Sequence, residues 1–214
     1  MYIKLDYFVY NYNLCMMKRY IVTAYDFDGT ITHKDTLLEF IKYSKGKWSF
    51  LRGFILYSPI LILMKLKLYP NWKAKQKIFS YYYRGMNINK FNSICDRFTN
   101  DRLYLLRNSA IKSLQNNIDN RHKVVIVSAS VDNWVASFVK QFDVKIIGTI
   151  IEIDKNDNIT GKFLTKNCCG QEKINRLLDV YPNREEYDLY AYGDSRGDKE
   201  LLEFADKSFY KIFY

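Results

Sequence analysis

Short apolar runs rich in β-branched residues recur along the chain and alternate with segments of helical periodicity. The first run, residues 21–25 (Ile-Val-Thr-Ala-Tyr), is typical of a buried strand. Further strands are predicted at residues 122–127, 145–153, 159–164, 188–192 and 207–212. Apolar residues at helical spacing predict helices around residues 174–181 and 201–205. Strands that alternate with helices indicate an α/β fold, in which helices cover both faces of a parallel sheet.

A long segment of mostly helical character separates the first predicted strand from the second. A crossover between two parallel strands needs much less chain than this. We therefore expect an inserted helical cap domain at residues 36–118 and a core formed by residues 20–35 and 119–214. The polar residues 154–158 join two of the predicted strands, so this pair is expected to form a β-hairpin.

The first nineteen residues are predicted to form an N-terminal extension without stable structure. Asp6, Asn11 and Asn13 stand where a signal peptide would need an apolar core. Translation that begins at Met16 or Met17 instead of Met1 would omit most of this extension.

Cysteine and histidine usage limits the kind of site that the chain can build. The four cysteines show no CxxC spacing, which is typical of reduced thiols in a cytoplasmic protein rather than of a disulfide framework or zinc site. With two histidines in the whole chain, a histidine-rich metal site is excluded. These residues are Cys15, Cys95, Cys168, Cys169, His33 and His122.

The formal net charge of +10 is concentrated in the predicted cap. No Asp or Glu occurs between Phe40 and Cys95, a stretch that holds eleven basic residues, whereas the rest of the chain has 22 basic and 23 acidic residues. Such a segment suits an anionic membrane surface, although a basic cap also attracts soluble phosphates, and charge alone would look similar in a nucleic-acid-binding protein.

An apolar run at residues 54–64 lies inside this basic segment and contains Pro59. As a helix it would be about 16 Å long, whereas the hydrocarbon core of a bilayer is about 30 Å thick, so we do not expect it to span a membrane. Two interpretations stay open. The run is either a buried helix of the cap or an interfacial segment whose flanking Arg52, Lys65 and Lys67 meet anionic headgroups.

Candidate chemistry begins directly after the first predicted strand, in the run Asp26-Phe27-Asp28-Gly29-Thr30. Positions two apart on a strand share a face, so Asp26 and Asp28 are expected to lie together at its C-terminal end. Gly29 would open the following turn. Two adjacent carboxylates repel unless a cation or a proton separates them. The alternative is an ordinary Asp-Gly turn in which one aspartate caps a helix.

Three later segments carry further polar residues at comparable places. Ser128 ends an apolar strand, where a serine is also a common helix N-cap. Lys173 stands in the first turn of a predicted helix but off its apolar stripe, where most lysines are solvated. Asp194 and Asp198 follow another strand and flank Gly197, in what is otherwise a plain loop that leads into a helix.

In this order and spacing, the five residues Asp26, Asp28, Ser128, Lys173 and Asp194, followed by Asp198, resemble the haloacid dehalogenase superfamily and its phosphoserine-phosphatase-like branch. Residues 26–40 and 167–205 are more similar still to the subgroup that contains bacterial phosphatidylglycerophosphatase of the C type. The resemblance implies a Rossmann-like core with a helical cap of the C1 type. One departure is Gly197, where phosphoserine phosphatases usually carry Asn; it concerns the substrate and not the type of reaction.

The resemblance also implies a magnesium-dependent phosphomonoester hydrolase. Asp26 would attack phosphorus to form an aspartyl-phosphate, and Asp28 would protonate the leaving alkoxide and then deprotonate the hydrolytic water. Mg²⁺ would be bound by Asp26, Asp194 and the backbone carbonyl of Asp28, because it prefers hard oxygen ligands. An acid at position 28 favours ester hydrolysis, since a departing halide needs no proton.

The remaining residues are given supporting roles by the same resemblance. Lys173 and Ser128 would stabilise charge on the phosphoryl group, and Asp198 would orient Lys173 or a metal-bound water. Asp35 lies where phosphoserine phosphatases place an acid near the substrate amino group, although the N-cap of a helix that starts at Thr36 is the simpler role. Arg84 is expected to reach a second anionic group of the substrate.

Three functional hypotheses follow. The first is a phosphatase for an anionic phospholipid headgroup such as phosphatidylglycerophosphate, which would be peripheral on the cytoplasmic face of the membrane and dock through the basic cap. The second is a soluble phosphatase of the phosphoserine type. The third is an inactive peripheral membrane protein, which predicts that at least one of Asp26, Asp28, Lys173 and Asp194 is missing, whereas all four are present. The expected partners are a phosphate monoester and an anionic membrane surface, with no nucleic acid, and the oligomeric state stays open.

Overall fold

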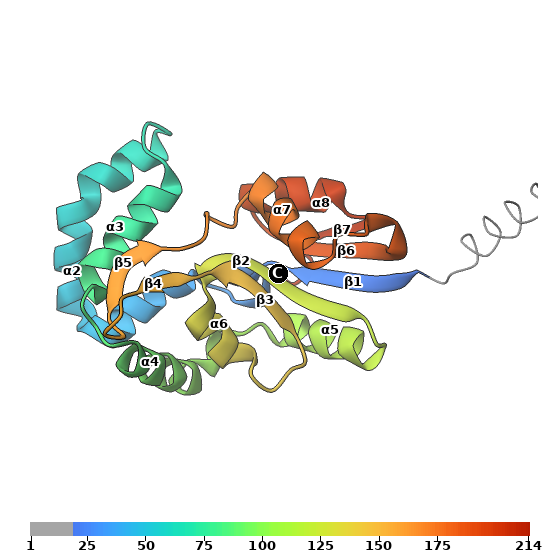
Figure 1. Cartoon of the computed structure of the whole chain (residues 1–214), viewed down its shortest axis with the longest axis horizontal. Coiled ribbons are helices and arrows are strands. Elements are labelled where there is room, and N and C mark those ends of the chain that lie inside the picture. Colours follow the sequence, from blue (N-terminus) through green and yellow to red (C-terminus); the bar gives the residue numbers. More distant parts are fainter. Residues whose placement is uncertain (1–18) are drawn as a thin grey trace, which may run out of the picture.

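The computed structural model describes residues 19–214, and within them a five-stranded parallel sheet forms the centre of the molecule (Figure 1). The strand order is β3-β2-β1-β6-β7, and every neighbouring pair is parallel. The predicted α/β class is therefore confirmed. The strands are β1 (Tyr20–Tyr25), β2 (Lys123–Val131), β3 (Lys145–Thr149), β6 (Tyr187–Gly193) and β7 (Lys207–Tyr210). The predicted N-terminal extension and the choice among Met1, Met16 and Met17 concern residues outside the described part, apart from Arg19.

Helices cover both faces of this sheet (Figure 1). On one face lie α5 (Asn108–Asp119) and α6 (Asp132–Val139), and on the other lie α7 (Gln171–Val180) and α8 (Lys199–Phe204). The alternation along β1 explains the two cores: Val22 and Ala24 pack with residues of α7 and α8, whereas Tyr25 packs with residues of α5 and α6. Short helical turns complete the core: η1 (Phe27–Ile31), η2 (Leu103–Leu105), η3 (Arg184–Glu186) and η4 (Arg196–Asp198).

The helices α2 (Thr36–Lys65), α3 (Asn71–Tyr83) and α4 (Ile88–Asp101) stand beyond one end of the sheet (Figure 1). A break at Gly46, whose φ is 79°, divides α2 into two parts. The β-hairpin of β4 (Ile151–Ile153) and β5 (Ile159–Phe163) packs on α3, where the rings of Phe79 and Phe163 are 5.3 Å apart. The predicted hairpin is thereby confirmed, and it extends over the helical insertion.

Two details of the predicted segmentation differ from the structure. The strand expected at residues 145–153 is two strands in different sheets, because the chain leaves the main sheet at Ile150. The N–H of Ile150 donates to Thr165 Oγ1 at 3.1 Å, and its carbonyl accepts from Leu164 N at 2.9 Å, so it is bonded to the segment that follows the hairpin. Helix α5 falls inside the insertion predicted at residues 36–118, but it packs against the sheet, where Asn117 Nδ2 donates to the Tyr25 hydroxyl at 2.6 Å.

A cluster of aromatic rings joins the insertion to the core. Phe40 of α2 is fully buried, and its ring lies 4.9 Å from that of Trp134 in α6. It also meets Tyr83, Phe91 and Phe98 at ring distances between 5.2 and 5.5 Å. Aromatic side chains bury large apolar areas, so this cluster holds the helical insertion in a defined position over the strand ends.

The apolar run at residues 54–64 forms part of the C-terminal half of α2, and much of it is exposed to solvent. Ile55, Leu56 and Ile62 are each about 60% exposed, at 63, 61 and 59%. The interpretation of this run as a buried core helix is therefore wrong. Within residues 19–214, α2 is long and apolar enough to cross a bilayer if judged by length and composition, although a single helix of this kind is weak evidence for a span.

Candidate active site

The site is built at the C-terminal ends of β1, β2 and β6. Asp26 directly follows β1, and its backbone N–H donates to Tyr192 O of β6 at 2.9 Å. Gly29 turns the chain in η1 with a φ of 87°, a conformation that favours glycine. A side chain here would also place its Cβ 2.4 Å from Asp194 Oδ2. Glycine at this position therefore lets the turn after β1 lie directly against the loop after β6.

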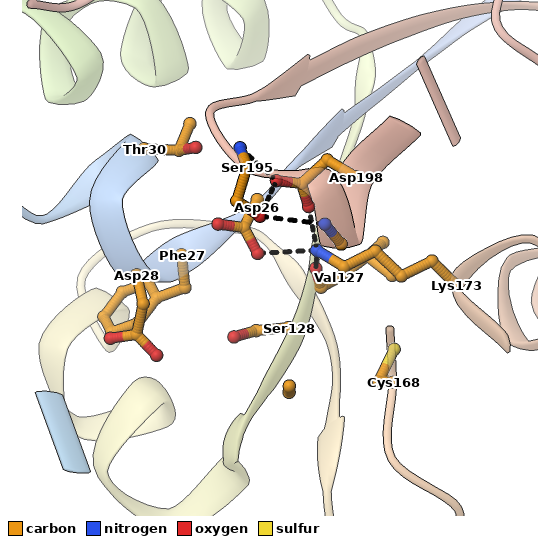
Figure 2. Close-up of polar contacts among 12 residues, drawn as sticks. Asp26, Phe27, Asp28, Thr30, Val127, Ser128, Cys168, Lys173, Ser195 and Asp198 are labelled. Carbon is orange, nitrogen blue, oxygen red and sulfur yellow. Dashed lines mark hydrogen bonds and ion pairs between the residues drawn. The ribbon is translucent and has the colours of Figure 1, made fainter. Parts of the chain in front are cut away.

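Lys173 is the centre of the buried charge network (Figure 2). It projects from the first turn of α7, is 2% exposed, and donates to Asp26 Oδ1 at 2.5 Å, Asp198 Oδ1 at 2.6 Å and Val127 O at 2.7 Å. These three acceptors use all three protons of the ammonium group. Burial alone would lower the pKa of Lys173, but the two carboxylates raise it above its ordinary value, so the residue stays charged.

Asp198 anchors Lys173 and the loop after β6. Its Oδ2 accepts hydrogen bonds from Asp194 N at 3.2 Å, from Ser195 N at 3.0 Å and from Ser195 Oγ at 2.8 Å, while Oδ1 accepts from Lys173. Burial would raise the pKa of Asp198, but Lys173 and the bonds from Ser195 outweigh it, so the pKa lies below its usual value. Asp198 is thus an ionised carboxylate whose oxygens are both already bonded.

Asp26 differs from Asp198 because one of its oxygens remains free. Its side chain is buried, and burial raises its pKa to about 7 against the opposing charge of Lys173. Within residues 19–214 its Oδ2 receives no hydrogen bond. A carboxylate that is held through one oxygen and open at the other suits a nucleophile or a metal ligand.

The carboxylate of Asp28 points away from that of Asp26 (Figure 2). Its Oδ1 accepts from Thr36 N at 2.8 Å and from Thr36 Oγ1 at 2.7 Å, and its Oδ2 accepts from the hydroxyl of Ser130. The expected face shared with Asp26 is wrong, because β1 ends at Tyr25 and strand alternation does not extend through the turn. Burial raises the pKa of Asp28, the nearby charge of Asp35 adds to this, and Lys75 opposes it.

Three carboxylates gather where a cation would be expected. Ligand oxygens of Asp26, Asp194 and Asp198 lie within 4.8 Å of one another. Asp194 also accepts from Thr30 Oγ1 at 3.3 Å and from the Tyr214 hydroxyl at 2.8 Å. Asp198 accepts four hydrogen bonds from protein donors, whereas each oxygen of Asp194 accepts one and Oδ2 of Asp26 accepts none among the described residues, so Asp26 and Asp194 keep the greater capacity to bind a cation. Carboxylate oxygens are the donors that Mg²⁺ prefers, so this donor set fits the expected metal.

The other predicted site residues are Ser128, Asp35 and Arg84, and the structure places each of them differently. Ser128 of β2 is buried, accepts from Ser130 N at 3.1 Å, and lies beside the two strand-end aspartates in Figure 2. Asp35 caps α2 by accepting from Leu38 N at 3.1 Å, which is the simpler of its two expected roles. Arg84 is exposed and ends α3, and its expected contact with substrate stays a prediction.

Three residues of the network were missed by the sequence analysis as site residues. Ser130 and Thr36 donate hydrogen bonds to the carboxylate of Asp28. Lys75 of α3 is half-buried, and its charge acts on both Asp28 and Cys169. It is one of the eleven cap cations, and nothing in the sequence separates it from the other ten. Which one faces the site depends on how α3 packs against the hairpin.

The departure at Gly197 has a local steric cause. A Cβ at this position would lie 2.8 Å from Cys169 Sγ, and Gly197 O accepts from Gly170 N at 2.8 Å. Glycine therefore lets η4 pack tightly against the chain that leads into α7. Cys95, Cys168 and Cys169 form no disulfide among the described residues, and Cys15 lies outside them.

Comparison with known protein families decides the assignment. Residues 23–203 match the model of the haloacid dehalogenase-like hydrolases. The chain belongs to this family. The expected fold and an enzymatic hydrolase are thus confirmed, and the strand-end aspartates, Ser128, Lys173 and the loop after β6 all lie within the matched segment.

Similar proteins cover most of the chain. Protein CicA of Caulobacter vibrioides is 32% identical over 199 residues, which span 90% of this chain and 86% of that protein. A solved structure of a protein of unknown function from Bordetella pertussis has a TM-score of 0.74 at 14% identity, with 89% of each chain covered. A substrate-bound phosphoserine phosphatase has a TM-score of 0.61 at 15% identity and covers 90% of this chain and 86% of its own. These structural likenesses show the fold.

Proposed function

We propose that this protein is a Mg²⁺-dependent phosphomonoester hydrolase that works through an aspartyl-phosphate. The observation that carries the proposal is the environment of Asp26. Its Oδ1 is held by the buried Lys173, its Oδ2 accepts no hydrogen bond among the described residues, and one of its oxygens lies within 4.8 Å of a carboxylate oxygen of Asp194. Asp26, Asp194 and the backbone carbonyl of Asp28 would hold Mg²⁺. When bound, the ion would supply positive charge that reduces the repulsion between a carboxylate nucleophile and a phosphate dianion.

The chain's own residues account for the two half-reactions. In the first, an oxygen of Asp26 forms a bond to phosphorus while the ester P–O bond breaks, and Asp28 transfers its proton to the leaving alkoxide. In the second, Asp28 takes a proton from water as the water oxygen bonds phosphorus, and the Asp26–phosphorus bond breaks to release phosphate. Burial raises the pKa of Asp28, which favours the protonated form that a general acid needs.

Lys173 and Ser128 support both steps. The ammonium of Lys173 is ordered by Asp198 and Val127 before any substrate arrives, so its charge needs no reorganisation during the reaction. Ser128 lies beside the strand-end aspartates and would donate its hydroxyl proton to a phosphoryl oxygen (Figure 2). Asp198 acts as a positioning residue through its contact with Lys173.

The substrate proposed is an anionic phospholipid headgroup such as phosphatidylglycerophosphate. The basic segment between Phe40 and Cys95 supports this, because eleven cations without an acid attract anionic lipid, and Lys75 brings one of them near Asp28. Such an enzyme would act at the cytoplasmic face of a membrane. The second candidate is a soluble phosphate of the phosphoserine type, which the likeness in fold to phosphoserine phosphatase favours. The assembled aspartates and Lys173 argue against the inactive protein.

The reaction is tested with an aryl phosphate and purified protein. We expect phosphate release that requires Mg²⁺, is lost with a chelator, and is abolished in Asp26→Asn. Asp179→Asn is the matched control, because Asp179 is an exposed aspartate on α7. Undiminished turnover in Asp26→Asn would refute the assigned nucleophile.

The substrate is tested by comparing phosphatidylglycerophosphate in mixed micelles with free phosphoserine. Higher turnover of the lipid is expected, and equal or better turnover of phosphoserine would end the lipid proposal while leaving the reaction in place.

A further inference from the structure

The C-terminal half of α2 presents an apolar face to the outside of the molecule. Its exposed members, which include the C-cap residue, have exposed fractions from 40 to 81%: Trp48, Leu51, Phe54, Ile55, Leu56, Ile62, Leu63 and Leu66. Five of them fall on one stripe of the helix, because steps of three, four or seven residues return to the same helix face: Trp48, Leu51, Ile55, Ile62 and Leu66. We call these eight residues the α2 apolar face. Contiguous apolar patches of this kind on a protein surface mark sites of interaction.

The opposite side of the helix is already occupied. Gly53 faces α3 so closely that a Cβ there would lie 1.8 Å from the Tyr82 hydroxyl, and the rings of Tyr57 and Tyr81 are 5.5 Å apart. Packing against α3 therefore sets the rotation of α2 and turns the α2 apolar face outward, at the edge of the molecule (Figure 1). A helix that is apolar on all sides is ordinarily buried among apolar groups. Among the described residues, α3 covers this part of α2 on one side only.

The charges around this face are of one sign. Arg52 lies within the α2 apolar face, between Leu51 and Phe54, Lys65 and Lys67 flank its last member, and Lys73 follows on α3. No acid occurs between Phe40 and Cys95. Side chains from Gly53 to Met64 carry no charge. That stretch is about 18 Å long as a helix, which is shorter than the roughly 30 Å of a bilayer core. The uncharged stretch is therefore too short to cross a bilayer core, and a helix that carries cations within and at the end of its apolar face is suited to lie along an anionic lipid surface.

We propose that the α2 apolar face docks on an anionic lipid bilayer, with α2 lying along the surface and its apolar side chains inserted among the headgroups. This deepens the proposed function, on which its relevance to the substrate rests, because it names the surface that would deliver an anionic lipid. Helix α3 packs on α2 and also carries Lys75, whose charge opposes the rise in the pKa of Asp28.

The tryptophans provide a readout in the unmodified protein. Trp48 belongs to the α2 apolar face and is 81% exposed, and Trp72 at the start of α3 is 42% exposed, whereas Trp134 is fully buried in the core. Vesicles of phosphatidylcholine mixed with phosphatidylglycerol should shift the emission to shorter wavelength as Trp48 leaves water, and the protein should sediment with them. Vesicles of phosphatidylcholine alone should do neither, and added salt should reverse the effect.

A variant of the face and a matched control localise the contact. Ile55→Asn combined with Leu56→Gln and Ile62→Gln should weaken sedimentation with anionic vesicles at least tenfold. The control combines Leu103→Gln, Leu164→Gln and Ile212→Asn, which change apolar residues outside α2 that are 50 to 63% exposed, and it should leave sedimentation unchanged. Both variants should hydrolyse the soluble aryl phosphate like the parent protein, which also shows that they are folded.

Three results would overturn the proposal: no sedimentation of the parent protein with anionic vesicles, equal binding of the α2 variant, or equal loss in both variants. Sedimentation velocity tests a second copy of the chain as the occupant. If the parent protein is a dimer, and the α2 variant is a monomer that still binds vesicles, the α2 apolar face is a dimer interface instead. Failure of docking is distinguishable from failure of the proposed function. Aryl phosphate turnover without vesicle binding rejects the docking alone, and vesicle binding without turnover rejects the phosphatase alone.

Discussion

Replacement of Lys173 by methionine would remove the cation from the buried network while keeping much of the side-chain volume. The change leaves Asp26 and Asp198 close together without a counter-charge, and it leaves Val127 O without its donor. Removal of one partner from a buried ion pair costs about 3 to 5 kcal/mol, because the remaining charge is buried and uncompensated. Lys173 is 2% exposed and its three contacts are between 2.5 and 2.7 Å, so we expect a loss in this range for Lys173→Met.

Magnesium should offset part of this loss. A cation bound between Asp26 and Asp194 would again neutralise charge in the network, so the free energy of unfolding of Lys173→Met should rise on addition of Mg²⁺ by more than that of the parent protein. Turnover should nevertheless stay about a hundredfold to a thousandfold lower, the size expected when one group that stabilises transition-state charge is removed.

The assay combines urea unfolding, with and without Mg²⁺, and aryl phosphate turnover at urea concentrations where the variant is folded. Lys166→Met serves as the control, since Lys166 is an exposed lysine on the segment that leads into α7, and should change neither quantity. The reasoning fails if Lys173→Met unfolds within about 1 kcal/mol of the parent protein in the absence of metal. It also fails if turnover by the folded variant is unchanged.

Two further predictions concern stability. Burial raises the pKa of Asp132 to about 6 against the attraction of Arg176, and its Oδ1 has no hydrogen-bond partner among the described residues. A pKa that is higher in the folded state than the unfolded value of 3.8 stabilises the folded protein at low pH. This stabilisation is lost as the pH rises through 6. The free energy of unfolding of the parent protein should therefore fall by about 2 to 3 kcal/mol between pH 4 and 7 through this group. Asp132→Asn should remove that part of the pH dependence, as measured by urea unfolding at both pH values, and an unchanged profile would contradict it. Phe40→Ala should lower the free energy of unfolding by about 3 to 5 kcal/mol, because it leaves a cavity in the aromatic cluster between α2 and α6. A decrease below about 1 kcal/mol in the same assay would show that the cluster does not join the insertion to the core.

The comparison of sequence and structure separates two kinds of information about the site. The segment order, with two aspartates after the first strand, a lysine at the start of a helix and two more aspartates in a later loop, is local information. It predicted which residues belong to the site because parallel strands place their C-terminal ends at one edge of the sheet. The direction of each side chain is different, because it depends on where the strand ends. Asp28 turned toward Thr36 and Ser130 because β1 stops at Tyr25.

Lys173 illustrates the same division. Its position in a first helical turn was plain from the sequence, but an isolated helix would leave it in solvent, and only the approach of β1, β2 and η4 to α7 buries it among three acceptors. The split of the strand expected at residues 145–153 is another case, since a chain that changes from one sheet to another keeps the same β-branched pattern throughout.

By itself, the amino-acid sequence determined the α/β class, the hairpin, the helical insertion and the family motifs, because each of these is written in periodicity or in short spacings. The tertiary structure alone decided that the charge of Lys75 acts on Asp28, and which side of α2 remains uncovered. Both depend on the packing of α3 against its neighbours, and contacts between segments distant in the chain leave no periodic signal. The uniform apolar pattern of residues 54–64 was compatible with a buried helix and with a surface one, and the placement of α3 on a single side of it made the difference.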